Sequence, residues 1–324
     1  MPPTSKARAA LSPAIPARAR LHVVTGKGGT GKTTAAVSLA LALVAGGRKV
    51  LVVEVEGRQA LAQLFDVAAL PYEERRLVSG PGNASLWGLA IDAEQAMIEY
   101  LDMFYGLKRS ARGLKKMGAV DFVTTLAPGL RDVLLTGKVK EAVTRTDADG
   151  HPAYDAVVLD APPTGRITKF LSATTEVANL TKFGPINRQS EGVIQLLHGR
   201  QTAVHLVTLL EEMPVQETID AAADLRAAGF PLGAVIVNRA RPALIEDGAV
   251  DTKLLTAGLR KVNLPAALVK GLVREVGDYA DRLAIQVENA DRLDELGLPR
   301  IELPDLNPPV ERGELNELAE RFLA

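Results

Sequence analysis

The chain has 324 residues, of which 47% are hydrophobic and 24% are charged, with a formal net charge of −1 and no cysteine. This composition supports a substantial core and gives no global attraction to nucleic acid or anionic membrane. The missing cysteines exclude disulfides, thiolate metal sites, iron–sulfur clusters and cysteine nucleophiles. No apolar run reaches the roughly 18 residues of a membrane-spanning helix, so we expect no stable membrane insertion.

Residues 1–20 are rich in Ala, Pro and Arg and contain no continuous apolar stretch. A secretory signal requires such a stretch, so we interpret this segment as a flexible tail, with a basic transit-like peptide as the alternative. We therefore expect a cytoplasmic protein whose folded part begins at residue 21.

The first predicted elements form a strand–helix–strand unit. Residues 21–25 are a short apolar run typical of a buried strand, residues 33–45 are an Ala/Leu/Val helix, and residues 50–55 are a second strand. Gly46 and Gly47 follow the helix, where a left-handed cap is favoured. The unit spans about 35 residues, which is the length of a βαβ crossover.

Five further strands are predicted, with helical patterns between them: 86–91, 156–160, 203–209, 234–238 and 299–303. This alternation favours an α/β fold, with a mostly parallel sheet flanked by helices. Two intervals, at about 93–150 and 168–200, are too long for simple crossovers and carry helical patterns. We predict that they form a helical subdomain inserted into one composite domain of residues 21–324.

One helical pattern in the first interval has an apolar face, made by Met97, Tyr100, Leu101, Phe104 and Leu107. Such a face favours packing within the helical subdomain. A groove for an apolar protein client is the alternative interpretation.

The segment GKGGTGKTT has the full P-loop spacing, in which Gly26 and four further residues precede Gly31, Lys32 and Thr33. The glycines let the backbone curl around phosphate with its N–H groups inward, and the helix that follows adds its positive end. The Lys32 ammonium can reach the β and γ phosphates, and the Thr33 hydroxyl can ligate magnesium. We predict an ATP site formed by Gly26, Lys27, Gly28, Gly29, Thr30, Gly31, Lys32, Thr33 and Thr34.

A P-loop also needs an acid on the magnesium side, at the end of a neighbouring strand. The segment AVVLDAPPTG supplies Asp160 at the carboxyl end of a buried strand, where open α/β sheets bind ligands. We predict that Thr33 and Asp160 hold Mg²⁺ directly or through water. Pro162, Pro163 and Gly165 fix a bent loop that can sense the γ phosphate.

Together these motifs resemble the arsenite-pump and tail-anchored-protein targeting ATPases. Lys27 inside the loop is typical of the deviant Walker A branch of P-loop ATPases, and DAPPTGRITKFL (160–171) is similar to the switch II segment of the family. The segments PGLRD (128–132), Glu217-Thr218 and Val237-Asn238 are similar to other family motifs. The resemblance runs from about residue 21 to 240 and is closest to actinobacterial proteins labelled anion-transporting ATPase.

The resemblance implies magnesium-dependent ATP hydrolysis that drives a conformational cycle in a dimer. The partner is a second copy or a paralogous ATPase, and Lys27 is expected to reach the partner's nucleotide. Asn238 is expected to contact adenine. We accordingly predict Lys27, Lys32, Glu56 and Asp160 as the catalytic residues.

The chain departs from the family in switch I, which usually reads DPAH and whose Asp orients the attacking water. This chain has Glu56-Gly57-Arg58-Gln59 instead. Glu56 falls in register with that Asp, and Glu54 is the competing assignment. In switch II, Arg166 and Ile167 replace the family's His and Thr. Because the cysteines that bind zinc or arsenite in the family are missing, its client and ion assignments do not carry over.

The same residues leave two other functions open. A partition or septum-positioning ATPase acting on DNA or membrane is the alternative, but the acid-containing C-terminal segment 312–324 is a poor match to an anionic membrane. We expect no nucleic-acid partner. A small-molecule kinase is a third interpretation. The histidines show no ligand spacing and are interpreted as structural or surface residues: His22, His151, His198 and His205.

Overall fold

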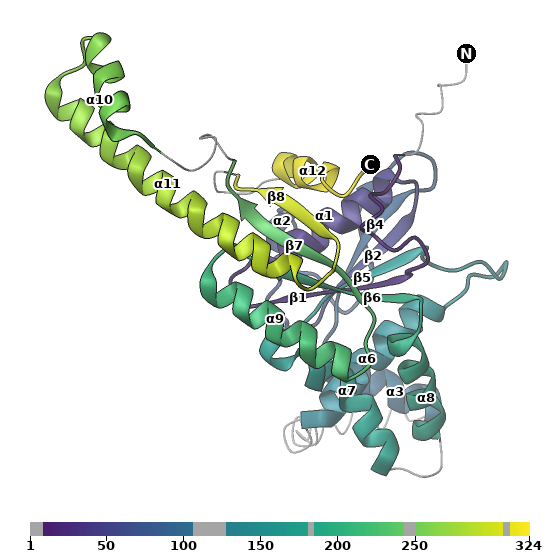
Figure 1. The fold of residues 1–324 in the computed structure, drawn as a ribbon. Coiled ribbons are helices and arrows are strands. Elements are labelled where there is room, and N and C mark those ends of the chain that lie inside the picture. The colour runs from purple at the N-terminus through teal and green to yellow at the C-terminus, as the bar shows by residue number, and fades with distance from the viewer. Residues whose placement is uncertain (1–8, 106–127, 181–184, 243–249, 307–311) are drawn as a thin grey trace, which may run out of the picture.

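An eight-stranded sheet runs through the chain in the order β3-β4-β2-β5-β1-β6-β7-β8 (Figure 1). The structure is a computed structural model that describes residues 9–105, 128–180, 185–242, 250–306 and 312–324. The strands are β1 (Leu21–Gly26), β2 (Lys49–Glu54), β3 (Arg75–Ser79), β4 (Ser85–Ala90), β5 (Ala156–Asp160), β6 (Thr202–Thr208), β7 (Leu232–Ala240) and β8 (Arg300–Pro304). All pairs are parallel except β3 with β4, so the predicted α/β class with a mostly parallel sheet is confirmed.

The edge strand β3 is the one that the sequence did not predict. Its residues RRLVS are exposed or half-buried, and it pairs antiparallel with β4 alone. A strand with one neighbour and one solvated face lacks the continuous apolar run that marks the central strands. The other seven predicted strands lie within two residues of their observed bounds.

The central strands are apolar throughout because both faces of the sheet are covered. In β1, Val24 points into one core, whereas Leu21 and Val23 point into the other. The first core lies under α1 (Lys32–Ala45), α2 (Ala60–Leu64) and α12 (Arg312–Glu320). The second lies under α6 (Pro128–Thr144), α7 (Thr164–Leu180), α8 (Pro185–His198) and the inner face of α9 (Glu212–Ala227). Alternate residues of one strand thus belong to opposite layers.

The two long intervals contain helices, as expected. The first holds α3 (Ala93–Tyr105) and α6, and the second holds most of α7 and all of α8. Figure 1 shows these four helices gathered at one end of the molecule. Met97 packs partly against the second core. The remaining residues of the predicted apolar face, Tyr100, Leu101, Phe104 and Leu107, have side chains outside the described part, so the client groove stays a prediction.

Residues 9–20 differ from the flexible tail that their composition suggested. Leu11 forms an antiparallel bridge with Leu323, and the amide of Ser12 donates to the carbonyl of Phe322. Ile15 and Ala19 are buried. The apolar side chains between the prolines find a partner in the C-terminal segment, which composition alone could not indicate. Residues 1–8 lie outside the described part.

Two further helices, α10 (Thr252–Lys261) and α11 (Ala266–Asp294), extend away from the sheet (Figure 1). Among the described helices, none combines the length and the hydropathy needed to cross a bilayer.

Candidate nucleotide site

The P-loop lies between the carboxyl end of β1 and the first turn of α1, as the sequence predicted. Its backbone requires glycine at two positions. A side chain at Gly26 would place its Cβ 2.2 Å from the carbonyl oxygen of Val207, and one at Gly31 would lie 2.1 Å from Nδ2 of Asn238. Gly31 also has a φ of 85°, in the left-handed region that favours glycine. The loop can therefore approach its neighbours as closely as a phosphate cradle requires.

Two side chains brace the loop from within the protein. The hydroxyl of Thr30 donates to the carbonyl of Lys27 over 2.9 Å, and Nδ2 of Asn238 donates to the carbonyl of Thr30, also over 2.9 Å. Asn238, which lies in β7 and is buried, is thus beside the P-loop. Its second N–H and its oxygen are the groups with which it could bind a base, and that role stays a prediction.

Lys32 and Thr33 begin α1 and face the end of β5. The Lys32 side chain is largely buried, and this burial lowers its pKa, against the nearby charge of Asp160. The Thr33 hydroxyl donates to Oδ2 of Asp160 over 2.6 Å. The geometry therefore brings the predicted phosphate-binding lysine and both predicted magnesium ligands together, with Thr34 next in the same helical turn.

The oxygens at this point fit a magnesium ion. Oδ1 of Asp160 is buried and has no hydrogen-bond partner among the described residues. Burial raises the pKa of Asp160 to about 6, against the Thr33 hydrogen bond and the Lys32 charge, which lower it. A hydroxyl and a carboxylate are hard oxygen ligands of the kind that Mg²⁺ prefers. A cation here would satisfy the orphaned oxygen and stabilise the ionised carboxylate.

The structure separates the two switch I acids that the sequence left open. Glu54 is 2% exposed, and its carboxylate accepts hydrogen bonds from the amides of Ala60 and Leu61, at the start of α2. Both of its oxygens are thereby occupied by a helix N-terminus. Glu56 lies one pleat further along, is partly exposed, and pairs with Arg58 over 3.4 Å. Of the two acids, Glu56 is the one whose carboxylate can turn toward a ligand.

Glu56 and Arg58 line a cavity of about 120 Å³ beside the loop that follows β5, together with Pro162 and Arg166. Asp132 is in the same lining, and Nη2 of Arg166 lies 3.6 Å from its Oδ1. Burial raises the pKa of Asp132, and the Arg166 charge acts against that shift. From the sequence alone, Asp132 is only a member of the PGLRD segment and Arg58 has no assigned role. The available signal was that Asp132 lies in a family-like segment and that Arg58 lies at the position of switch I.

The loop lysine, Lys27, is directed toward helix α9. Its Nζ lies 2.7 Å from Oε1 of Glu217, which belongs to α9, and both side chains are about one third exposed. Gly28 and Gly29, next to Lys27, are exposed. The pair Glu217-Thr218 was recognised in the sequence as family-like, but its contact with Lys27 could not be foreseen from their separation in the chain.

Comparisons with known proteins agree with this geometry. Residues 19–199 match the sequence profile of the anion-transporting ATPases. The chain is 54% identical to the ATPase BagA of Mycobacterium tuberculosis, over 93% of this chain and 92% of that protein. It is 30% identical to a putative arsenical pump-driving ATPase of Aquifex aeolicus, over 48% and 38% of the two chains. The ATPase GET3 of Kluyveromyces lactis is 28% identical, over 59% and 55%.

Proposed function

The chain belongs to the anion-transporting ATPase family and is a P-loop ATPase, and from this premise we propose that it hydrolyses ATP with Mg²⁺ in a dimer whose conformation changes during turnover. One observation carries the proposal: the Thr33 hydroxyl lies 2.6 Å from the Asp160 carboxylate, next to the buried Lys32 ammonium. This arrangement suits the binding of a triphosphate together with its metal ion. The proposal names no client.

Phosphate binding is assigned to the loop backbone and Lys32. The N–H groups of residues 26–34 and the N-terminus of α1 supply a fixed positive potential, and no reorganisation is needed when charge moves toward the β–γ bridge oxygen. The Lys32 ammonium neutralises the β and γ phosphates. Thr33 and Asp160 would hold a Mg²⁺ ion, which would supply positive charge that stabilises the negative charge of the phosphates.

Orientation of the attacking water is assigned to Glu56. Glu56 lines the cavity beside the post-β5 loop, and its carboxylate pairs with the exposed Arg58. Water attacks the γ phosphorus, the bond to the bridging oxygen breaks, and ADP and phosphate leave. A carboxylate that accepts a hydrogen bond from this water aligns it for in-line attack.

The proposal of a dimer rests on the position of Lys27. In the free chain this lysine does not point at its own phosphate cradle but pairs with Glu217 at 2.7 Å. A cation that is turned away from its own nucleotide is free to serve a partner's, as an arginine finger does in trans.

The proposal is tested by phosphate release from ATP by the purified full chain, with no added acceptor. We expect turnover with Mg²⁺ and none with excess EDTA. Asp160→Asn should raise the Mg²⁺ requirement by at least about tenfold, whereas the exposed Asp149→Asn should match the parent. Phosphate transfer that depends on an added small-molecule acceptor would instead support the kinase interpretation.

A further inference from the structure

We call residues 252–294 the arm. This segment comprises α10, α11 and the turn between them. Figure 1 shows α11 running away from the sheet, with α10 lying along its far end. At about 1.5 Å per residue, the 29 residues of α11 give a helix about 43 Å long. Its near half packs on α9, but α10 has no buried residue at all. Within the described part of the single chain, the far half of the arm therefore has no partner outside the arm.

The arm carries most of the large apolar side chains that the described residues expose. Five of those seven side chains belong to it. Three are in its far half, Leu254 (72% exposed), Val262 (64%) and Leu268 (48%), and two are in its near half, Ile285 (50%) and Val287 (61%). Isolated exposed apolar residues are ordinary, but their gathering on one projection indicates a surface that another surface covers.

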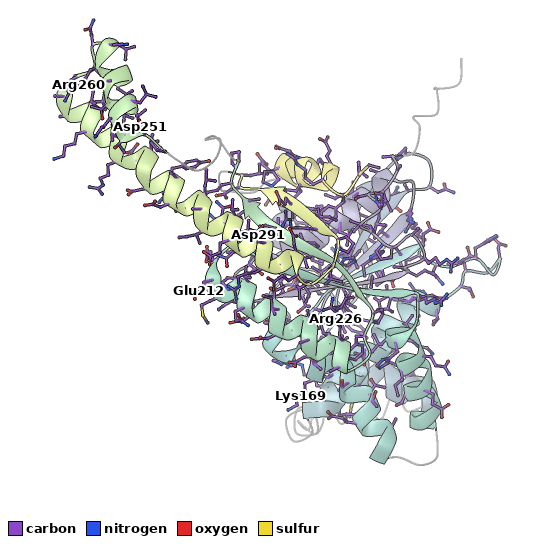
Figure 2. The ribbon with its side chains drawn as sticks, in the orientation of Figure 1. Lys169, Glu212, Arg226, Asp251, Arg260 and Asp291 are labelled. Carbon is purple, nitrogen blue, oxygen red and sulfur yellow. The ribbon has the colours of Figure 1, made fainter. Side chains whose placement is uncertain are left out.

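The charges of the arm are separated along its length. Residues 252–274 contain five cations and no acid: Lys253, Arg260, Lys261, Lys270 and Arg274. Residues 275–294 contain six acids and two cations: Glu275, Asp278, Asp281, Glu288, Asp291 and Asp294, with Arg282 and Arg292. Figure 2 shows Arg260 at the far end and Asp291 close to the body. Among the described residues, the ion pairs of these groups are Arg274 with Asp278 and Asp294 with Arg300, so most of the charge is unpaired.

We propose that the arm docks antiparallel on the arm of a second copy of this chain. An antiparallel arrangement places the far half, with a net charge of +5, on the partner's near half, with a net charge of −4. The same contact is made twice about a twofold axis, which is the self-complementary arrangement of a cyclic dimer. It also covers exposed apolar side chains in both halves.

Other binding partners would match the charges and apolar side chains of the arm less completely. A parallel pair of arms would place like charges together, which costs several kcal/mol in an interface. An anionic membrane would satisfy the cations of the far half but would leave Ile285 and Val287 uncovered and would repel the acids beside them. The arm contact needs no nucleotide, so it goes beyond the ATP-dependent dimer proposed through Lys27. The two can fail separately, because one is measured as association without nucleotide and the other as turnover.

A charge swap tests the proposal on the full chain. Lys261→Glu with Lys270→Glu lowers the net charge of the far half from +5 to +1, and Asp281→Lys with Glu288→Lys raises that of the near half from −4 to 0. Sedimentation velocity without nucleotide should show that each double variant alone associates at least about tenfold more weakly than the parent. Mixed in equal amounts, the two variants should recover part of the association, because one of the two contacts of the mixed dimer then joins an unchanged far half to an unchanged near half.

Controls separate this result from general effects of charge. Glu317→Lys with Glu320→Lys reverses two exposed acids on α12 and should leave association unchanged. Leu254→Gln should also weaken association, because it removes an exposed apolar side chain and leaves every charge in place. Parental association by either double variant alone, or a mixture no tighter than its components, would overturn the proposal. So would a parent that is monomeric without nucleotide, or one that instead sediments with phosphatidylglycerol vesicles through its far half.

Discussion

Nζ of Lys27 lies 2.7 Å from Oε1 of Glu217, so in the single chain the P-loop lysine is paired with α9 of the same chain. If this lysine serves a partner's nucleotide, the ion pair has to open before each productive contact. Glu217 then competes with the partner for the same cation.

The first prediction follows from that competition. Glu217→Gln should increase ATP turnover at protein concentrations where association limits the rate. Because an ion pair this exposed contributes at most about 1 kcal/mol, the increase should be about two- to fivefold. Combining it with Lys27→Ala should abolish the gain. An equal gain with Lys27 removed would show that Glu217 acts through some other group.

The second prediction is complementation between two inactive variants. Lys32→Ala should lose turnover because its own phosphate contact is lost, and Lys27→Ala should bind ATP normally but turn over at least about 10³-fold more slowly. Their mixture should regain activity, since one mixed site joins an intact Lys32 with a partner's intact Lys27. A mixture as inactive as its parts, or Lys27→Ala with full activity, contradicts the trans role.

The third prediction separates the two acids of switch I. Glu56→Gln should slow hydrolysis by about 10²-fold while nucleotide affinity, measured by fluorescent ATP-analogue binding, stays near the parental value. Glu54→Gln should mainly lower the thermal midpoint, because it weakens the bonds to the α2 amides. The opposite pair of phenotypes would move the catalytic assignment to Glu54.

The fourth prediction concerns the dependence of magnesium affinity on pH. Burial raises the pKa of Asp160 to about 6 in the metal-free protein, so the carboxylate is increasingly protonated below that pH. Mg²⁺ must displace this proton, and its apparent affinity should fall by about tenfold per pH unit below 6 and level off above 7. Magnesium titrations of ADP binding between pH 5 and 8 measure this. An apparent affinity that does not change with pH would mean that Asp160 does not contribute to Mg²⁺ binding.

The fifth prediction uses a buried pair that serves no catalytic step. Nδ1 of His22 lies 3.1 Å from Nε2 of His205, and Nδ1 of His205 accepts from the amide of Ala234, so both rings are held neutral. Burial lowers the pKa of His205 to about 4 and holds that of His22 well below its usual value. The unfolded chain therefore binds more protons between about pH 6.5 and 4, and stability falls as pH falls through that range.

The variant His205→Gln can keep the acceptor for Ala234 without the titration. Its urea midpoint is expected to lie below the parental one at pH 7.5 but to decline less on going to pH 5. A parallel decline in both proteins would mean that the pair does not contribute to acid sensitivity. The quantity to compare between the two proteins is the change in urea midpoint from pH 7.5 to pH 5. Asp132 and Asp160 have raised pKa values and shift stability in the opposite direction in both proteins.

The sequence could predict what depends on local spacing. The loop from Gly26 to Thr34 and Asp160 at the end of β5 could be identified because a phosphate cradle and a strand-end acid each have a fixed pattern along the chain. Central strands were recognisable because both of their faces are apolar. The half-solvated strand β3 has no such pattern and was missed.

What depends on tertiary contact could not be read from the chain. Glu54 and Glu56 are equivalent as post-strand acids until the first amides of α2 are seen to donate to the Glu54 carboxylate. Lys27 and Glu217 are distant in sequence, and residues 9–20 resemble a tail until their bonds to the C-terminal segment are known. Each of these outcomes was decided by a partner elsewhere in the chain.

The length of the arm would also enlarge any small movement at its base. Its near end leads into β8, where Arg300 pairs with Asp294 over 2.8 Å, and β8 lies against β7, which carries Asn238 beside the P-loop. On a helix about 43 Å long, a tilt of about 5° at the base carries the far end through about 4 Å. A strand movement too small to disturb the hydrogen bonding of the sheet would thus become a displacement the size of a side chain at Arg260, where a spin or fluorescent label could measure it.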